Sequence, residues 1–128
     1  MSSQLRRIFV LDDDDFNLEV AEVALTTVGS YEVRTFSSGA DMLAAAGQQA
    51  PDLLLSDVRM PAMTGPAAFA ELRKLPGCNT TPVVFMTADN TPAEVQSLMD
   101  LGAAAVLPKP LDAMQLATQI QAAWDELE

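Results

Sequence analysis

The sequence predicts an α/β domain in which a five-stranded parallel sheet is covered by helices on both faces. Short apolar runs alternate with longer segments of helical periodicity, as in repeated βα units. The chain has 128 residues, of which 49% are hydrophobic. This is the size of one domain with one core, so we expect a single domain over residues 1–128.

Five apolar runs are predicted to be strands: residues 7–11, 31–36, 52–56, 82–86 and 104–107. Four of them are almost entirely apolar, which is typical of strands that are buried on both faces of a sheet. The run at 31–36 alternates polar and apolar residues, which indicates an edge strand. No apolar run approaches the ~20 residues needed to cross a bilayer.

Five helices are predicted between and after these strands: 16–28, 39–46, 66–75, a fourth that opens at Thr91 and ends at Gly102, and a fifth from Asp112 through Trp124. Their ends carry local signals. Asp14 or Asp15 can cap the first helix and Ser38 the second. The segment Thr91-Pro92-Ala93-Glu94 combines an N-cap, a proline at the first helical position and a capping-box glutamate.

The charge balance restricts the partners that we expect. Seven Lys and Arg residues stand against 18 Asp and Glu residues, a formal net charge of -11. Such a chain repels nucleic-acid phosphates and anionic membrane surfaces, so we expect neither as a direct partner. It favours cations and basic protein surfaces. The N-terminus lacks the apolar stretch of a secretory signal, and a cytoplasmic location is therefore expected.

Two residue counts exclude whole classes of chemistry. The sequence contains no histidine and one cysteine, Cys78. This rules out Ser-His-Asp and Cys-His nucleophiles, His-ligated zinc, an internal disulfide and a phosphohistidine on this chain. Cys78 lies in a Pro-Gly-Cys-Asn-Thr turn and is expected to be an incidental loop residue.

Polar residues fall at the ends of four predicted strands. Asp12 and Asp13 follow the first, Asp57 the third and Thr87 the fourth, and Lys109 lies just beyond the fifth. In open parallel sheets, ligands bind beyond the carboxyl ends of the strands. Taken singly, each residue can be an ordinary cap or loop charge. Together, at strand ends in chain order, they predict one site.

A group of carboxylates at one place requires neutralisation, and a hard divalent cation provides it. We expect Mg²⁺, with Asp13 and Asp57 as direct ligands and the backbone carbonyl of Arg59 as a further ligand. Asp12 would act through a bound water molecule or by contacting the ligands rather than the metal. The carboxylate of Asp57 can then attack a phosphoryl group and form an acyl phosphate. Lys109 and the Thr87 hydroxyl would stabilise the phosphoryl oxygens.

The sequence resembles the receiver domain of response regulators over essentially its whole length. The residues that carry the resemblance are Val10 to Asp14, Pro51 to Gly65 with the block Asp-Val-Arg-Met-Pro, Pro82 to Ala88, Leu101-Gly102-Ala103 and Lys109-Pro110. The resemblance implies the doubly wound, flavodoxin-like (βα)5 fold. It also implies the strand order 2-1-3-4-5, which is an established property of this family of folds.

The resemblance further implies function. A histidine kinase or a histidine phosphotransfer protein would supply the phosphoryl group to Asp57. A downstream target or output domain would bind the face formed by the fourth helix, fifth strand and fifth helix. Such a domain takes up and loses a phosphoryl group but is not a turnover enzyme. The bond before Pro110 is expected to be cis, and small Ala88 is expected to leave room at the phosphoryl pocket.

One position departs from the family pattern. Receivers usually carry an aromatic residue three positions before the lysine, and here that residue is Val106. A β-branched side chain has few rotamers and no ring to turn inward. We therefore expect any signal on that face to travel through backbone and loop shifts. Nearly identical structures of the face with and without a phosphoryl mimic would contradict this expectation.

Two flanking charges can set the lifetime of the acyl phosphate. Arg59 and Asp89 each lie two residues after a site residue and are expected to face each other across the pocket mouth. A salt bridge there would hinder an attacking water. The alternative is a pair of ordinary surface charges that contribute little.

Two other functions fit parts of this pattern. A phosphatase or phosphotransferase that forms an aspartyl phosphate would share the metal and the nucleophile. It would also need a second acid/base carboxylate soon after Asp57 and a cap over the pocket, and neither is present in the sequence. A pseudo-receiver would be a phosphorylation-independent interaction module, but every expected site residue is present.

Overall fold

The computed structural model describes residues 4–127. Five parallel strands form one sheet in the order β2-β1-β3-β4-β5, so the predicted order is confirmed and β2 is an edge strand, as its alternating sequence indicated. The strands are β1 (Arg7–Leu11), β2 (Glu32–Phe36), β3 (Leu53–Asp57), β4 (Val83–Thr87) and β5 (Ala105–Pro108).

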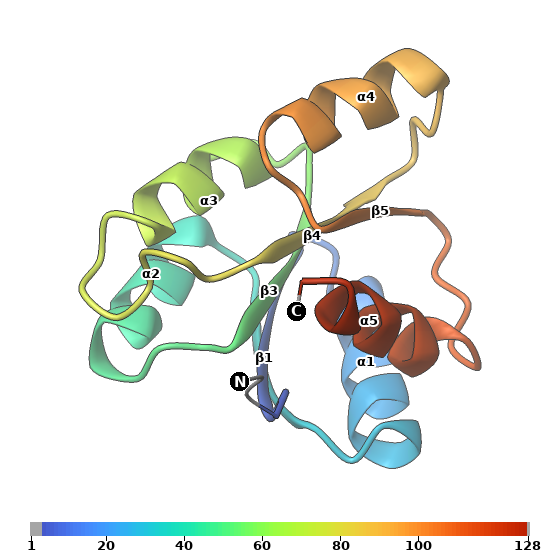
Figure 1. Cartoon of the computed structure of the whole chain (residues 1–128), viewed down its shortest axis with the longest axis horizontal. Coiled ribbons are helices and arrows are strands. Elements are labelled where there is room, and N and C mark those ends of the chain that lie inside the picture. The colour runs from blue at the N-terminus through green and yellow to red at the C-terminus, as the bar shows by residue number, and fades with distance from the viewer. Residues whose placement is uncertain (1–3, 128) are drawn as a thin grey trace.

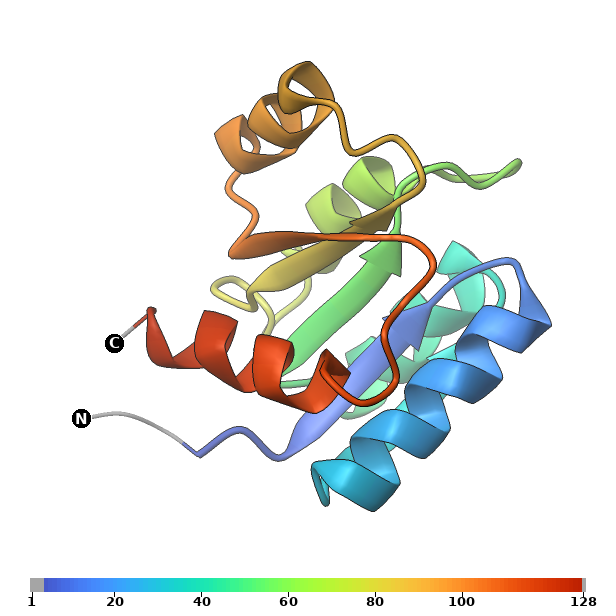
Figure 2. The ribbon, with the colours of Figure 1, turned by 90° about the vertical axis from the view of Figure 1, so that its right-hand side faces the viewer.

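The helices cover both faces of the sheet (Figures 1 and 2). They are α1 (Asp15–Val23), continued by a π-helical turn η1 (Ala24–Val28), α2 (Gly39–Gln48), α3 (Gly65–Leu72), α4 (Pro92–Asp100) and α5 (Leu116–Asp125). One face carries α1 and α5, and the other carries α2, α3 and α4. Within residues 4–127, no helix is both long and apolar enough to span a bilayer.

Alternation along the strands divides the core into two layers. In β1, Ile8 and Val10 pack with α1 and α5, whereas Phe9 and Leu11 pack with α2, α3 and α4. Successive strand side chains point to opposite faces, and both faces here are covered. For this reason the central strands need apolar residues at almost every position, which produces the continuous runs seen in the sequence.

Local capping accounts for most helix starts. Asp14 accepts a hydrogen bond from the N–H of Phe16 at 2.9 Å, and Ser38 accepts one from that of Asp41 at 3.2 Å. Thr91 Oγ1 accepts one from the N–H of Glu94 at 3.4 Å. These caps confirm the predicted starts of α1, α2 and α4.

Two predicted helix bounds were wrong for identifiable reasons. The third helix ends at Leu72 rather than Leu75, because Pro76 disfavours helical backbone in the residue before it. The fifth begins at Leu116 rather than Asp112. The Asp112 carboxylate instead accepts a hydrogen bond from the N–H of Met114 at 3.0 Å. Such local hydrogen bonds from Asp side chains to the backbone compete with helix formation.

Cys78 is also a correction. Its side chain is fully buried in the layer that packs against α2 and α3, so it is a core residue and not an incidental one. The turn that carries it connects α3 to β4 and folds inward there, with the N–H of Cys78 donating to the carbonyl of Leu75 at 3.0 Å.

Candidate functional site

The predicted site residues meet at the carboxyl edge of the sheet. In the parallel register, Leu11 pairs with Ser56, and Thr87 pairs with Pro108. The residues that end or follow these strands therefore lie at one edge, as the pattern predicted. They are Asp12 and Asp13 after β1, Asp57 at the end of β3, Thr87 at the end of β4 and Lys109 after β5.

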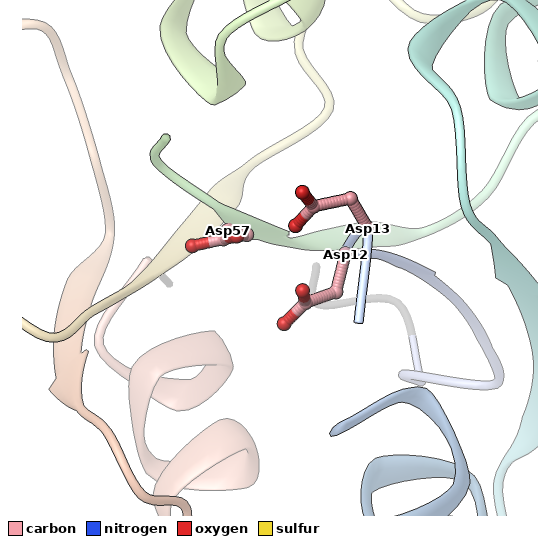
Figure 3. Close-up of side chains that lie close together, drawn as sticks. All are labelled: Asp12, Asp13 and Asp57. Carbon is pink, nitrogen blue, oxygen red and sulfur yellow. The ribbon is translucent and has the colours of Figure 1, made fainter. Parts of the chain in front are cut away.

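Three carboxylates converge at this edge (Figure 3). One carboxylate oxygen from each of Asp12, Asp13 and Asp57 lies within 4.8 Å of the others. Asp12 is fully buried, Asp57 is 7% exposed and Asp13 is exposed. The trio therefore opens to solvent on the side of Asp13 and is closed on the side of Asp12.

Lys109 joins the two buried carboxylates. Its Nζ lies 3.0 Å from Asp12 Oδ2 and 3.0 Å from Asp57 Oδ1. The backbone N–H of Lys109 donates to the carbonyl of Thr87 at 2.9 Å, which holds the start of the following loop on β4. The peptide bond from Lys109 to Pro110 is cis, as expected.

The pKa values follow from this geometry. Burial raises the pKa of the Asp57 carboxyl, and the charge of Asp12 raises it further, while Lys109 and the N–H of Val58 oppose the rise. Burial alone would lower the pKa of Lys109, but its contacts with Asp12 and Asp57 outweigh burial and leave that pKa raised. The site therefore holds a cation beside more negative charge than that cation neutralises.

A small pocket lies beside Asp57. Its volume is about 180 Å³, and it is lined by Asp57, Val58, Arg59, Thr87, Ala88 and Lys109. The Thr87 hydroxyl is engaged with its own loop: it accepts from the N–H of Asp89 at 3.0 Å and donates to the carbonyl of Asp89 at 3.2 Å. To serve a group bound in the pocket, this hydroxyl must exchange those partners.

Arg59 and Asp89 face each other, as predicted. Arg59 Nη2 lies 3.8 Å from Asp89 Oδ2, but it lies closer, at 3.3 Å, to Oε2 of Glu94 on α4. Hydrogen bonding by the side chain and N–H of Thr91, and then the charge of Arg59, lower the pKa of Asp89. The sequence indicated Glu94 only as a capping residue, and no sequence signal linked it to Arg59.

Two further residues lie against the backbone carbonyl of Asp57, and the sequence pattern indicated a role for neither. Ser56 Oγ donates to the carbonyl of Asp57 at 2.9 Å. A methyl group at Gly65 would lie 2.1 Å from that same carbonyl oxygen, so the first residue of α3 must be glycine for the helix to approach so closely. In the sequence, Gly65 stood out only as the last residue of the block that resembles receivers.

Three predicted features remain: Ala88, Val106 and the backbone carbonyl of Arg59. Ala88 lines the pocket. Val106 is half-buried on β5 and packs against the core layer of α2, α3 and α4. The role of the Arg59 backbone carbonyl as a metal ligand stays a prediction.

The donor set fits a hard divalent cation. Three carboxylates within 4.8 Å match the oxygen ligands that Mg²⁺ and Ca²⁺ prefer. In addition, the fully buried Asp12 Oδ2 receives no well-oriented hydrogen bond from residues 4–127, although Lys109 lies beside it as an ion-pair partner. A metal or a metal-bound water would satisfy such a buried carboxylate oxygen.

Fold and site together define a class of protein: a doubly wound α/β domain with an acidic trio, a hydroxyl and an ammonium group at the carboxyl edge of its sheet. The sequence model of the response regulator receiver domain matches residues 8–121. The chain belongs to this family, and it is a receiver domain of two-component signalling.

Individual relatives agree with this assignment. The chain is 37% identical to the response regulator PleD of Caulobacter vibrioides over 116 residues, which cover 90% of this chain and 25% of PleD. It is 38% identical to the DNA-binding transcriptional regulator NtrC of Escherichia coli over 105 residues, 82% of this chain and 22% of NtrC. The chain thus spans about a quarter of the length of these curated relatives.

A solved structure shows the same fold. The chemotaxis response regulator CheY4 of Vibrio cholerae is similar with a TM-score of 0.84 at 28% identity, covering 94% of this chain and 99% of that one. This likeness agrees with the flavodoxin-like receiver fold predicted from the sequence.

Proposed function

We propose that this domain is a phosphoacceptor switch and that Asp57 takes the phosphoryl group from a histidine kinase or a histidine phosphotransfer protein. The observation that carries the proposal is the position of Lys109, 3.0 Å from both Asp57 and Asp12, at the border of a pocket that Asp57 lines. A carboxylate with a fixed ammonium group and open space beside it has the parts that in-line phosphoryl transfer requires.

In the transfer, an oxygen of the Asp57 carboxylate forms a bond to phosphorus while the bond from phosphorus to the donor imidazole nitrogen breaks. The electron pair of that bond stays on the imidazole, which takes up a proton. Lys109, 3.0 Å from Asp57 Oδ1, would pair with an oxygen of the transferred group, and the Thr87 hydroxyl would donate to another after leaving Asp89.

Mg²⁺ is the cation that we propose for this site, with Asp13 and Asp57 as direct ligands, Asp12 acting through a water molecule or outside the direct ligands, and the backbone carbonyl of Arg59 as a further ligand. Bound there, it would supply positive charge to neutralise the carboxylates and the phosphoryl oxygens. Asp13 is the exposed member of the trio, so it offers the open side of the site to the cation.

We further propose that the domain takes up one phosphoryl group and later loses it to water, rather than turning over a small substrate. Asp57 is followed by Val58, Arg59 and Met60, none of which can serve as a general acid or base at neutral pH. A downstream target or output domain would bind the face of α4, β5 and α5; Met99 of α4 is an exposed apolar residue.

Phosphorylation by a small donor tests the proposal. The parent protein is incubated with acetyl phosphate and Mg²⁺, and intact mass is measured against Asp57→Asn and against Asp41→Asn. Asp41 is an exposed carboxylate in the first turn of α2 that belongs neither to the acidic trio nor to the lining of the pocket beside Asp57. The parent and Asp41→Asn should gain one phosphoryl group and Asp57→Asn none. Equal modification of Asp57→Asn, or no modification of the parent, would contradict it.

A further inference from the structure

Arg59 is shared between the phosphorylation pocket and helix α4. It lines the pocket beside Asp57, while its Nη2 pairs with Glu94 Oε2 at 3.3 Å. Glu94 stands in the first turn of α4 and is held there through its N–H, which donates to Thr91 Oγ1. The ion pair therefore ties the loop that follows Asp57 to the start of α4.

Of the two acidic partners, Glu94 holds Arg59 more firmly. The Glu94 side chain is 16% exposed, whereas that of Asp89 is 40% exposed and its Oδ2 lies at 3.8 Å. A shorter and less solvated pair is screened less by water and salt. In the structure, the guanidinium is thus directed mainly to α4.

A phosphoryl group on Asp57 would change this balance. It carries nearly two negative charges at neutral pH, and guanidinium groups bind phosphate oxygens through paired hydrogen bonds. One guanidinium cannot lie over the phosphoryl group and against Glu94 with the same donors. The two anions therefore compete for Arg59.

We propose that Glu94 is a positioning residue that holds Arg59 on α4 in the unphosphorylated domain and yields it to the phosphoryl group of Asp57. This inference rests on the proposed function. Transfer of Arg59 protects the acyl phosphate and at the same time releases the first turn of α4 from the loop after β3. The release gives α4 a route to report phosphorylation that does not need an aromatic ring at Val106.

The lifetime of the acyl phosphate tests the competition. In hydrolysis, a water oxygen forms a bond to phosphorus, the bond from phosphorus to the Asp57 oxygen breaks, and its electron pair stays on the carboxylate as inorganic phosphate leaves. Protein loaded with acetyl phosphate and Mg²⁺ is desalted, and the phosphoprotein is followed by intact mass. Glu94→Gln should lose its phosphoryl group about two- to five-fold more slowly, the range that an exposed ion pair allows.

Matched variants separate this role from a general surface-charge effect. Glu71→Gln removes an equal charge from α3, where Glu71 pairs with Lys74 at 2.8 Å, and should leave the lifetime unchanged. Arg59→Ala should shorten it. The double variant of Arg59→Ala and Glu94→Gln should decay like Arg59→Ala alone. An unchanged or shorter lifetime in Glu94→Gln, or full additivity in the double variant, would overturn the inference.

Hydrogen exchange on the unphosphorylated protein provides a readout that does not depend on Asp57 chemistry. The amide of Val95 donates to the carbonyl of Thr91 at 3.0 Å in the first turn of α4. Glu94→Gln and Arg59→Ala should each speed its exchange about two- to five-fold relative to Glu71→Gln. Unchanged exchange in both variants would refute the tie between Arg59 and α4 whatever the outcome of the phosphorylation experiment.

Discussion

Replacing Gly65 by alanine should destabilise the domain and displace Asp57 together. The added methyl would lie 2.1 Å from the carbonyl oxygen of Asp57 and 3.0 Å from Ser56 Oγ. An ordinary carbon–oxygen contact is about 3.3 Å, so an atom must move by about 1 Å. The nearest atom belongs to the backbone of a buried central strand, which cannot rotate away as a side chain would.

The loss in free energy of unfolding caused by Gly65→Ala follows from the rigidity of the contact. Overpacking a rigid core site costs typically about 1–3 kcal/mol, and contact with strand backbone places Gly65→Ala at the upper end, about 2–3 kcal/mol. For a domain of 128 residues, 1 kcal/mol shifts the Tm by about 4 °C. We therefore expect the Tm to fall by about 8–12 °C, together with slower phosphorylation of Asp57 because its carboxylate moves with its carbonyl.

Gly47→Ala is the matched control. Gly47 lies in α2 with no atom within 4 Å of an added methyl, and alanine favours helix over glycine by about 0.5–1 kcal/mol. The same substitution should therefore raise the Tm by about 2–4 °C there. Thermal unfolding followed by circular dichroism measures both. A Gly65→Ala protein that melts within about 2 °C of the parent would refute the close approach of α3 to Asp57.

Three further changes test other parts of the structure. Asp13→Asn should raise the free energy of unfolding by about 1 kcal/mol in the absence of divalent cations, because it relieves repulsion within the acidic trio. The variant should also gain less stability from added Mg²⁺ than the parent does. Urea titrations with and without Mg²⁺ measure both effects, and a variant less stable than the parent without cations would contradict the prediction. Cys78 is fully buried and burial raises the pKa of its thiol, so a thiol reagent should label it slowly in buffer and rapidly in urea; native labelling at the rate of a free thiol would show that the turn is open. Burial, and then the charge of Asp125, raise the pKa of Tyr31 in the folded domain. The phenol therefore ionises at a lower pH in the unfolded chain than in the folded one, and the free energy of unfolding should fall as pH rises through about 10. Tyr31→Phe should lower the free energy of unfolding by about 1 kcal/mol at neutral pH, because it removes the hydrogen bond from Tyr31 to Gln121. In a pH scan, the stability of this variant should fall less than that of the parent above about pH 10. An identical fall in both proteins would exclude Tyr31 as its source.

Several parts of the site could be predicted from the sequence because their causes are local. Strand positions follow from apolar runs, and Asp57 and Thr87 could be placed at strand ends by counting along those runs. The start of α4 follows from Thr91 and Pro92. Of the two helix bounds that were wrong, the end of α3 lies ahead of Pro76. The start of α5 lies where the Asp112 side chain competes with the helix, a competition between near-equal local energies that the sequence pattern does not resolve.

By itself, the sequence determined the α/β class, the polar residues at the carboxyl ends of the strands, and Asp57 as the expected acceptor, because periodicity and strand ends are properties of neighbouring residues. Only the tertiary structure decided which of these groups touch. The 3.0 Å contacts of Lys109 with Asp12 and Asp57, the close approach of Gly65 to the Asp57 carbonyl and the pairing of Arg59 with Glu94 each join residues from different elements. Such contacts depend on how helices pack on a twisted sheet, and side chains distant in sequence carry no local sign of them.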